Sequence, residues 1–333
     1  MTRRRAGIVG TGSALPPTVL TNAYFESLPE LRTSDQWIIE HTGIRERRKA
    51  APGEGLSLYA TEAAKRALEM ANLAAEELDL IICGTFTPDV PIPGSSNLIQ
   101  ANLAAKRAAA FDLQAACSGF VYAAVVAQQF IETGKYRRVL AVGADLLSRV
   151  TDFTDRTTCI LFGDGAGAVV MRDVEPEFGI LASNIHSDGA QGQFLTVPAG
   201  GSLLPASHET VEQRLHFVRM EGKATFKIAV RSMERSAEDA LRQAGYGVED
   251  VKLFIAHQAN KRISDAVVDR LGLSPDRVYE NIERVGNTSA GSIPIALDEA
   301  VRQGRVRQGD LVLLTAFGGG LTWGSVLLRW AIK

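Results

Sequence analysis

Continuous apolar runs alternate with stretches of helical periodicity along most of this chain. Runs with the length of strands and few polar positions occur at residues 78–84 and 138–143, and again at 251–256 and 311–316. A strand covered on both faces has such a run, whereas a strand with one solvated face alternates apolar and polar residues. Because helical stretches separate the runs, the pattern predicts an α/β protein whose parallel strands are covered by helices on both faces.

The second half of the chain repeats the plan of the first. Residues 78–84 (LDLIICG) align with residues 251–257 (VKLFIAH) at an offset of about 173 residues, and Cys117 aligns with Asn287 at an offset of about 170 residues. Repeats of this length predict a duplicated α/β unit, because solenoid repeats are much shorter. We expect one compact body, since no long linker separates the halves. The predicted halves are residues 1–172 and 173–333.

Composition narrows the possible functions. The 333 residues carry a formal net charge of -2, so no strong field draws the chain to nucleic acid or to an anionic membrane. No apolar run is long enough to span a bilayer. The 3 cysteines show no metal-ligand or CxxC spacing, and so few cysteines fit a reducing compartment. We therefore expect a cytoplasmic protein that binds neither metal nor membrane.

Three residues with side chains suited to acyl transfer follow apolar or semi-apolar runs that we interpret as strands. They are Cys117 in FDLQAACSGF, His257 in FIAHQAN and Asn287 in VGNTSAG. We expect all three at the carboxyl ends of strands, where α/β proteins build their sites. The start of a helix after Cys117 would favour its thiolate form, which makes it the candidate nucleophile. The other two cysteines, Cys83 and Cys159, lie inside apolar runs and are predicted to be core residues.

From these residues alone, two chemistries stay open. A papain-like hydrolase also uses cysteine, histidine and asparagine, with the asparagine orienting the histidine, although the local sequences differ from those of that family. Alternatively, His257 and Asn287 both donate hydrogen bonds to one developing oxyanion, which suits formation of an enolate from a thioester. The glycine-rich residues 317–324 (FGGGLTWG) could add backbone donors. The early GTGS lacks the third glycine of a dinucleotide fingerprint, which excludes a Rossmann cofactor site.

Long motifs in a fixed order carry a family resemblance over nearly the whole chain. They are TSDQWIIEHTGIRERR, DLQAACSGF, TDRTTCILFGDGAGAVV, HSDGAQG, AHQANKRI, GNTSAGSIPIALDEAV and AFGGGLTWGS. In these motifs the chain resembles the β-ketoacyl-acyl carrier protein synthase III family of the thiolase superfamily. The resemblance implies a homodimer with a duplicated, five-layered αβαβα fold, an α/β architecture with two mixed, mainly parallel sheets.

The resemblance also implies a reaction and roles for the three residues. Cys117 would take an acyl group from acyl-CoA, the substrate, with no tightly bound cofactor. Malonyl-acyl carrier protein would then lose carbon dioxide, and the resulting enolate would attack the acyl-enzyme, which would initiate fatty-acid synthesis. His257 and Asn287 would hold the malonyl thioester oxygen during decarboxylation. The backbone N–H groups of Cys117 and Gly319 would form the oxyanion hole for acyl transfer and condensation.

Further residues are assigned binding roles by the same resemblance. Trp37 and Arg156 would sandwich the adenine of CoA, a role that suits an indole and a guanidinium. Lys227 and Arg262 would meet the acidic carrier protein at the entrance. The pantetheine tunnel would be lined by Thr33, Gly222, Phe226 and Asn260.

The chain departs from the family pattern at three positions. His41 and Asp269 stand where family members often have basic residues, which lowers the positive charge near the expected carrier docking face. Ile92, in VPIPGSS, aligns with a residue that caps the partner's acyl pocket, and it is smaller than the aromatic residue of some members. We therefore expect tolerance of acyl chains longer or more branched than acetyl. A condensing enzyme of secondary metabolism with the same three residues is the main alternative, and a cysteine hydrolase is a weaker one.

Overall fold

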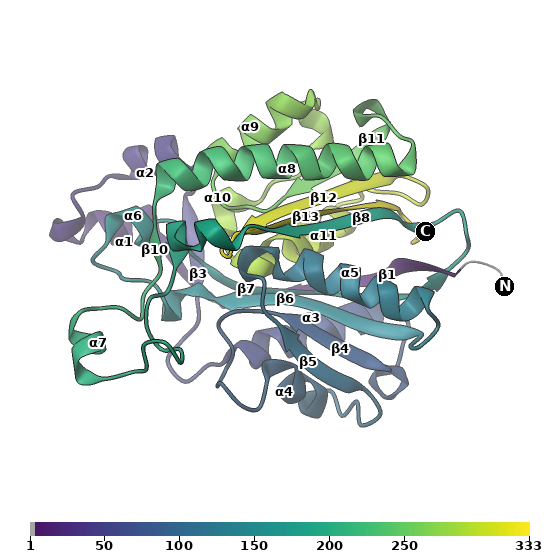
Figure 1. Ribbon diagram of the computed structural model, residues 1–333, viewed down its shortest axis with the longest axis horizontal. Coiled ribbons are helices and arrows are strands. Elements are labelled where there is room, and N and C mark those ends of the chain that lie inside the picture. The colour runs from purple at the N-terminus through teal and green to yellow at the C-terminus, as the bar shows by residue number, and fades with distance from the viewer. Residues whose placement is uncertain (1–3) are drawn as a thin grey trace.

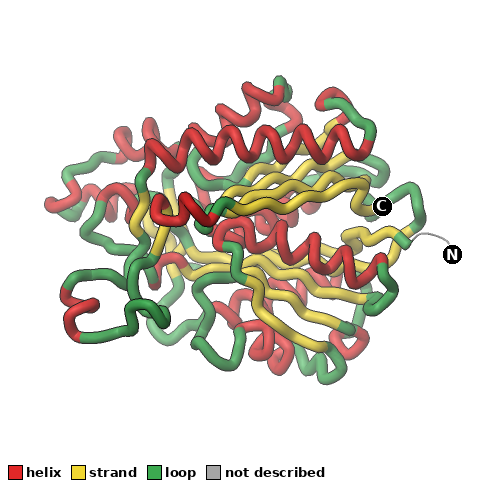
Figure 2. Tube along the Cα trace, in the orientation of Figure 1, coloured by secondary structure: helices red, strands yellow, loops and turns green. Residues whose placement is uncertain are grey.

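The computed structural model describes residues 4–333, which form alternating layers of helices and sheets. Figure 1 shows two main sheets, with helices between them and helices on the outer face of each, and Figure 2 marks the same layers by type of secondary structure. The resulting order is helix, sheet, helix, sheet, helix. The fold is therefore the five-layered αβαβα arrangement that the sequence resemblance predicted. Among residues 4–333, no helix combines the length and apolarity that crossing a bilayer would require.

The first main sheet has the strand order β1-β7-β6-β4-β5. Its strands β4, β5 and β6 are parallel, whereas β7 pairs antiparallel with both β6 and β1. The edge strand β5 pairs only with β4 among the described strands. The bounds are β1 (Arg5–Ala14), β4 (Leu80–Gly84), β5 (Ala109–Leu113), β6 (Arg138–Leu146) and β7 (Asp164–Val174).

The second main sheet repeats this order as β8-β13-β12-β11. Strand β11 is parallel to β12, and β13 pairs antiparallel with both β12 and β8. An isolated parallel bridge between Phe254 and Val278 stands where β5 pairs with β4 in the first sheet. The order and directions of these four strands match those of β1, β7, β6 and β4, which bears out the duplication. Both sheets are mixed as expected, but antiparallel pairing is more extensive than the prediction of mainly parallel sheets. The bounds are β8 (Gly179–Ser187), β11 (Val251–Ala256), β12 (Leu311–Gly318) and β13 (Thr322–Arg329).

The buried strands are apolar throughout because both faces are covered. In β4, Leu80 and Ile82 point into the core between the sheets, and Ile81 and Cys83 point into the core under the outer helices. This alternation follows from the two-residue period of a strand. The outer helices are α3 (Leu56–Met70) and α4 (Ser95–Asn102) on the first sheet, and α8 (Gly222–Ala244) and α9 (Lys261–Leu271) on the second.

Two helices lie between the sheets, and each begins close to a residue of the candidate site predicted from the sequence. They are α5 (Gly119–Glu132) and α11 (Ser292–Arg302), and side chains of both join the core shared by the two sheets. A helix that is covered on all sides has apolar residues on every face, and most residues of both helices are apolar. A short 3₁₀ turn precedes each helix, at Ala116–Ser118 and at Ser289–Gly291.

The positions of these turns show that the alignment of Cys117 with Asn287, predicted from the sequence, is wrong. The turns and the helices that follow them match at an offset of 173 residues, from Ala116 to Ser289 and from Gly119 to Ser292. Ala116 and Ser289 also share the left-handed backbone conformation, with φ of 44° and 51°. The structural equivalent of Cys117 is therefore Ala290 rather than Asn287.

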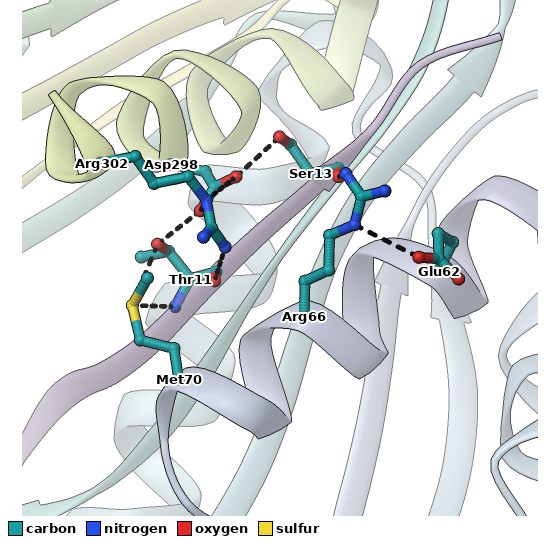
Figure 3. Close-up of polar contacts among 7 residues, drawn as sticks. All are labelled: Thr11, Ser13, Glu62, Arg66, Met70, Asp298 and Arg302. Atoms are coloured by element: carbon teal, nitrogen blue, oxygen red, sulfur yellow. Dashed lines mark hydrogen bonds and ion pairs between the residues drawn. The ribbon is translucent and has the colours of Figure 1, made fainter. Parts of the chain in front are cut away.

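A buried polar cluster joins α11 to the edge strand β1 and so connects the two halves (Figure 3). The carboxylate of Asp298, 1% exposed, accepts hydrogen bonds from the hydroxyls of Thr11 at 2.8 Å and Ser13 at 2.7 Å. It also pairs with Arg302, one helical turn further on, at 3.0 Å. Each oxygen of this buried charge has partners, which is the condition for burying a carboxylate without a large penalty.

Smaller elements cover one end of the layers. In Figure 1 the segment with α7 extends from the body, and α1, α2 and α6 gather beside β3. The bounds are β2 (Thr18–Thr21), β3 (Glu46–Lys49), β9 (Leu195–Thr196), β10 (Arg219–Met220), α1 (Asn22–Glu26), α2 (Asp35–Thr42), α6 (Arg156–Cys159), α7 (His208–Glu212) and α10 (Ile282–Val285).

Candidate active site

Cys117, His257 and Asn287 line one cavity of about 490 Å³. Most of its remaining lining is apolar and includes Leu161 and Phe317. A concave, largely apolar pocket with a few converging polar groups is the usual form of a ligand site. The structure thus brings the three residues together from separate parts of the chain.

The backbone around Cys117 places this residue in the wall of the cavity, just before the start of α5. Strand β5 ends at Leu113, and the left-handed residue Ala116 turns the chain sharply just before Cys117. The helix can begin here because Gly84 and Gly119 let α5 approach β4 closely: a Cβ on Gly84 would lie 2.4 Å from the carbonyl carbon of Gly119. Small residues in this segment therefore serve the approach of helix to strand.

The thiol of Cys117 is protonated at neutral pH. Burial raises the pKa of this thiol to about 12, a hydrogen bond with Ser289 opposes the rise, and the charge of Asp145 adds to it. The hydroxyl of Ser289 lies 3.3 Å from the sulfur of Cys117. The sequence predicted that the helix start would favour the thiolate, and the desolvation of the thiol overrides that preference.

Asp145 is the buried carboxylate behind this pair, and it lies at 0% exposure near the end of β6. One of its oxygens accepts hydrogen bonds from the hydroxyls of Thr85 at 2.9 Å and Thr87 at 2.8 Å, and the other accepts the backbone N–H of Ala290 at 3.2 Å. Burial raises the pKa of Asp145, and the nearby Ser289 side chain is first among the groups that oppose the rise. Ser289 therefore contacts the thiol and lies close enough to the buried carboxylate to affect its pKa.

His257 follows directly after β11, as predicted, and its ring is 2% exposed. Burial lowers the pKa of its imidazole to about 3, so the ring is neutral near pH 7. Its Nδ1 lies 2.7 Å from the hydroxyl of Ser292, the first residue of α11. A neutral histidine with one ring nitrogen held and the other toward a cavity can act as a hydrogen-bond partner for substrate but not as a cation.

Asn287 is oriented by its own turn. Its side-chain oxygen accepts the backbone N–H of Ser289 at 2.9 Å, which leaves the amide nitrogen as the group available to the cavity. Its backbone is fixed to the segment before β7, because its N–H donates to Leu161 and its carbonyl accepts from Gly163. The prediction that Asn287 ends a strand is wrong: it follows the short helix α10 and forms only an isolated bridge with Phe162.

Two residues of the cavity wall, Cys117 and Gly319, have backbone amides of interest. Gly319 lines the cavity just after β12, and Gly318 approaches so closely that a Cβ there would lie 2.7 Å from the backbone nitrogen of Cys117. Neither the N–H of Cys117 nor that of Gly319 is used by the turn and loop hydrogen bonds found among residues 4–333. Both residues line the same cavity, and neither amide is occupied by those bonds.

The residues expected to bind CoA fall into two groups. Gly222, Phe226 and Asn260 line the cavity. Trp37 and Arg156 lie outside it and contact each other directly, with the guanidinium 4.6 Å from the centre of the indole ring. Because the guanidinium already lies against the face of the indole, Arg156 must move before an adenine could enter between them.

The two groups are close along the surface. The side-chain nitrogen of Asn260 donates to the carbonyl of His41 at 3.1 Å, and the ring of His41 stacks on Trp37 at 4.1 Å. Arg156 donates to the carbonyl of Arg32 at 2.8 Å, next to Thr33, whose hydroxyl is enclosed and has no hydrogen-bond partner among the described residues. His41 thus packs against the indole, although the sequence associated this position with carrier docking.

The remaining predicted residues lie away from the cavity wall. Lys227 on α8 and Arg262 on α9 are exposed, and neither forms an ion pair among the described residues. Asp269 is exposed on the same helix as Arg262. Ile92 is 85% exposed and lines no part of its own chain's cavity.

Comparisons with known proteins give this arrangement a family. Family models described as 3-oxoacyl-[acyl-carrier-protein] synthase III and its C-terminal part match residues 111–189 and 241–330. A protein of Caldanaerobacter subterraneus subsp. tengcongensis, named beta-ketoacyl-[acyl-carrier-protein] synthase III, is 52% identical over 98% of both chains. The chain belongs to this family. Members of the synthase III family are acyltransferases of the condensing type, and this chain is such an enzyme.

Solved structures of the synthase III family have the same fold. The crystal structure of 3-oxoacyl-[acyl-carrier-protein] synthase III from Aquifex aeolicus is 48% identical, has a TM-score of 0.90, and is matched over 98% of this chain and 100% of that one. The priming β-ketosynthase of the R1128 polyketide biosynthetic pathway is 36% identical, with a TM-score of 0.91 and coverage of 99% and 97%.

Sequence reasoning missed three polar residues of this synthase III site. Ser289 and Ser292 lie inside the quoted GNTSAGS motif, and their positions relative to Asn287 could have suggested that they support it. Asp145 gave no signal, because its contact with Ala290, next to Ser289, depends on the two halves of the chain packing together.

Proposed function

We propose that the protein is a β-ketoacyl-acyl carrier protein synthase III that initiates fatty-acid synthesis. It would transfer an acyl group from acyl-CoA to Cys117 and then condense that group with malonyl-acyl carrier protein. The observation that carries the proposal is the convergence of one thiol, one neutral imidazole and one oriented amide on a single cavity. Family membership supports the same reaction.

In the first step, the sulfur of Cys117 attacks the thioester carbon of acyl-CoA, and the CoA sulfur leaves. The thiol proton ends on the departing CoA, so that the products are an acyl-enzyme thioester and CoA–SH. Because the pKa of Cys117 is raised, this proton must leave during the attack, and the hydroxyl of Ser289 is the protic side chain at the sulfur. The amides of Cys117 and Gly319 would hold the negative oxygen of the tetrahedral intermediate.

In the second step, the malonyl thioester loses carbon dioxide, and its thioester oxygen gains the charge of an enolate. His257 and Asn287 would donate hydrogen bonds to that oxygen. The carbon nucleophile then attacks the acyl-enzyme, which gives 3-oxoacyl-carrier protein and restores the thiolate, which regains a proton. Decarboxylation itself creates the carbanion, so a neutral His257 suffices and no strong base is needed.

CoA would bind along the path from Trp37 to the cavity. Arg156 would open to admit adenine against the indole, with Thr33 beside the path. Gly222, Phe226 and Asn260 would line the pantetheine channel. Lys227 and Arg262, both exposed, would meet the acidic carrier protein, which predicts a salt-sensitive association.

A homodimer fits the exposed edge of the first sheet. Strand β5 pairs only with β4 among the described strands, and its Phe111 is 36% exposed. An open edge strand with an exposed aromatic residue is suited to pairing with a second copy. The nearby Ile92, 85% exposed, would then reach the partner's acyl pocket and leave room for chains longer or more branched than acetyl.

The direct test is mass spectrometry of the intact protein after incubation with a panel of acyl-CoAs, followed by addition of malonyl-acyl carrier protein. We expect an acyl adduct on Cys117, its loss on addition of the carrier, and release of 3-oxoacyl-carrier protein. Cys117→Ser should form no thioester adduct. An adduct on Cys83 or Cys159, or release of free acid without malonyl substrate, would refute the proposal.

A condensing enzyme of secondary metabolism is the second candidate. It is favoured by the likeness to the priming β-ketosynthase of a polyketide pathway, at 36% identity over nearly the whole of both chains. The two candidates are separated in the same assay by comparing the rates with malonyl-loaded carrier proteins of fatty-acid and of polyketide synthesis.

A further inference from the structure

The hydrogen bonds around His257 determine which ring nitrogen carries its proton. Nδ1 lies 2.7 Å from the hydroxyl oxygen of Ser292, and the backbone N–H of Gln258 donates to that same oxygen at 3.3 Å. Ser292 is 0% exposed, so bulk solvent does not reach its hydroxyl. The serine therefore has two neighbours, one of which can only donate.

We propose that Ser292 is a positioning residue that holds His257 as the neutral tautomer with its proton on Nε2. The hydroxyl of Ser292 has one hydrogen to give, and among residues 4–333 the only acceptor within hydrogen-bonding distance is Nδ1 of His257. A buried hydroxyl that leaves its hydrogen unpaired is costly, so the O–H donates to Nδ1. Nδ1 then carries a lone pair, and the ring proton is on Nε2.

This tautomer suits the reaction proposed above, on which its functional consequence rests. His257 lines the cavity, and Nε2 has no hydrogen-bond partner among the described residues. With the proton on Nε2, the ring donates to the oxygen that becomes negative. The other tautomer would direct a lone pair at that oxygen and repel it. Ser292 can enforce the choice because it is the first residue of α11 and is packed between the two sheets.

The tautomer can be measured without any substrate. Protein labelled with ¹⁵N in histidine should show, for His257, a bare Nδ1 and a protonated Nε2 in long-range proton–nitrogen correlation spectra near neutral pH. His257→Asn identifies the signals by their loss. A protonated Nδ1 in the wild-type protein would overturn the proposal, whatever reaction the enzyme catalyses.

The functional part is tested with Ser292→Ala and the matched control Ser264→Ala. Ser264 is also a buried serine, and its hydroxyl has no hydrogen-bond partner among the described residues. We expect Ser292→Ala to slow decarboxylation of malonyl thioester by about 10-fold to 100-fold, the range found when a metal-ligating histidine loses the hydrogen bond that orients it, while self-acylation stays within about twofold. The control should change neither rate.

Two results distinguish a failure of this inference from a failure of the proposed function. If the wild-type protein fails to condense but shows the Nε2–H signals, the reaction is misassigned and the tautomer stands. If the wild type condenses and Ser292→Ala decarboxylates malonyl thioester at the wild-type rate with unchanged ¹⁵N signals, Ser292 does not position His257. Melting curves show whether the variant is folded, and the wild-type spectrum decides the tautomer if it is not.

Discussion

Stability should depend on pH through His257 in a way that can be calculated. Burial lowers the pKa of its imidazole from 6.5 to about 3 in the folded protein, and the unfolded chain restores the ordinary value. Between these two values the unfolded state binds one more proton, so the free energy of unfolding falls as the pH falls below about 6.5. Above that pH both states are neutral and His257 has no effect. Linkage gives a loss of about 2 kcal/mol between pH 7 and pH 5, and about 5 kcal/mol over the whole interval.

The assay is denaturant unfolding of the wild type and of His257→Asn at fixed protein concentration, at about pH 7 and about pH 5. Asparagine does not titrate, and all other groups are common to both proteins, so their contributions cancel in the difference. The stability of the wild type relative to the variant should fall by about 2 kcal/mol between the two pH values. An unchanged difference would show that His257 titrates normally, which would refute a buried neutral imidazole as the donor.

Three further predictions address the thiol, the CoA path and the junction between the halves. Alkylation of Cys117 by iodoacetamide should still accelerate up to about pH 10, because burial raises its pKa to about 12, and a plateau near pH 8 would contradict this. Trp37→Ala should raise KM for acyl-CoA about tenfold but leave acyl-pantetheine, which lacks adenine, unaffected in the same self-acylation assay. Asp298→Ala should lower the free energy of unfolding by about 2 kcal/mol, because the buried hydroxyl of Thr11 and the hydroxyl of Ser13 lose their acceptor. Removal of the exposed carboxylate in Glu62→Ala should have far less effect in the same denaturant titration, and equal losses would contradict this.

The layered fold was predictable because the strongest sequence signal comes from burial. Strands covered on both faces are apolar throughout, so the segments that became β4, β6, β11 and β12 were identified directly. Strand β8 (Gly179–Ser187) was not identified from the sequence. Its second part lies near the surface and interrupts the apolar pattern, for example at Ile185, which is 40% exposed, and at His186. Antiparallel pairing was underestimated for a related reason: a buried antiparallel strand such as β7 looks like a parallel one.

The candidate site was predictable where a sequence motif contains the residue. It was not predictable where the role of a residue depends on tertiary packing. Cys117, His257 and Asn287 were singled out from their local sequences, and the structure places them around one cavity. The raised pKa of Cys117 was not foreseen, because desolvation depends on everything packed around the thiol. The role of Asp145 depends in the same way on contacts between segments that are distant in sequence.

The central claim is that Cys117 performs the covalent step while His257 and Asn287 stabilise the enolate. It is tested most directly by measuring the two half-reactions of Asn287→Ala separately. Release of carbon dioxide from malonyl-acyl carrier protein should fall by about 100-fold, whereas acylation of Cys117 by acyl-CoA should stay near the wild-type rate. An equal loss of both half-reactions would contradict the account.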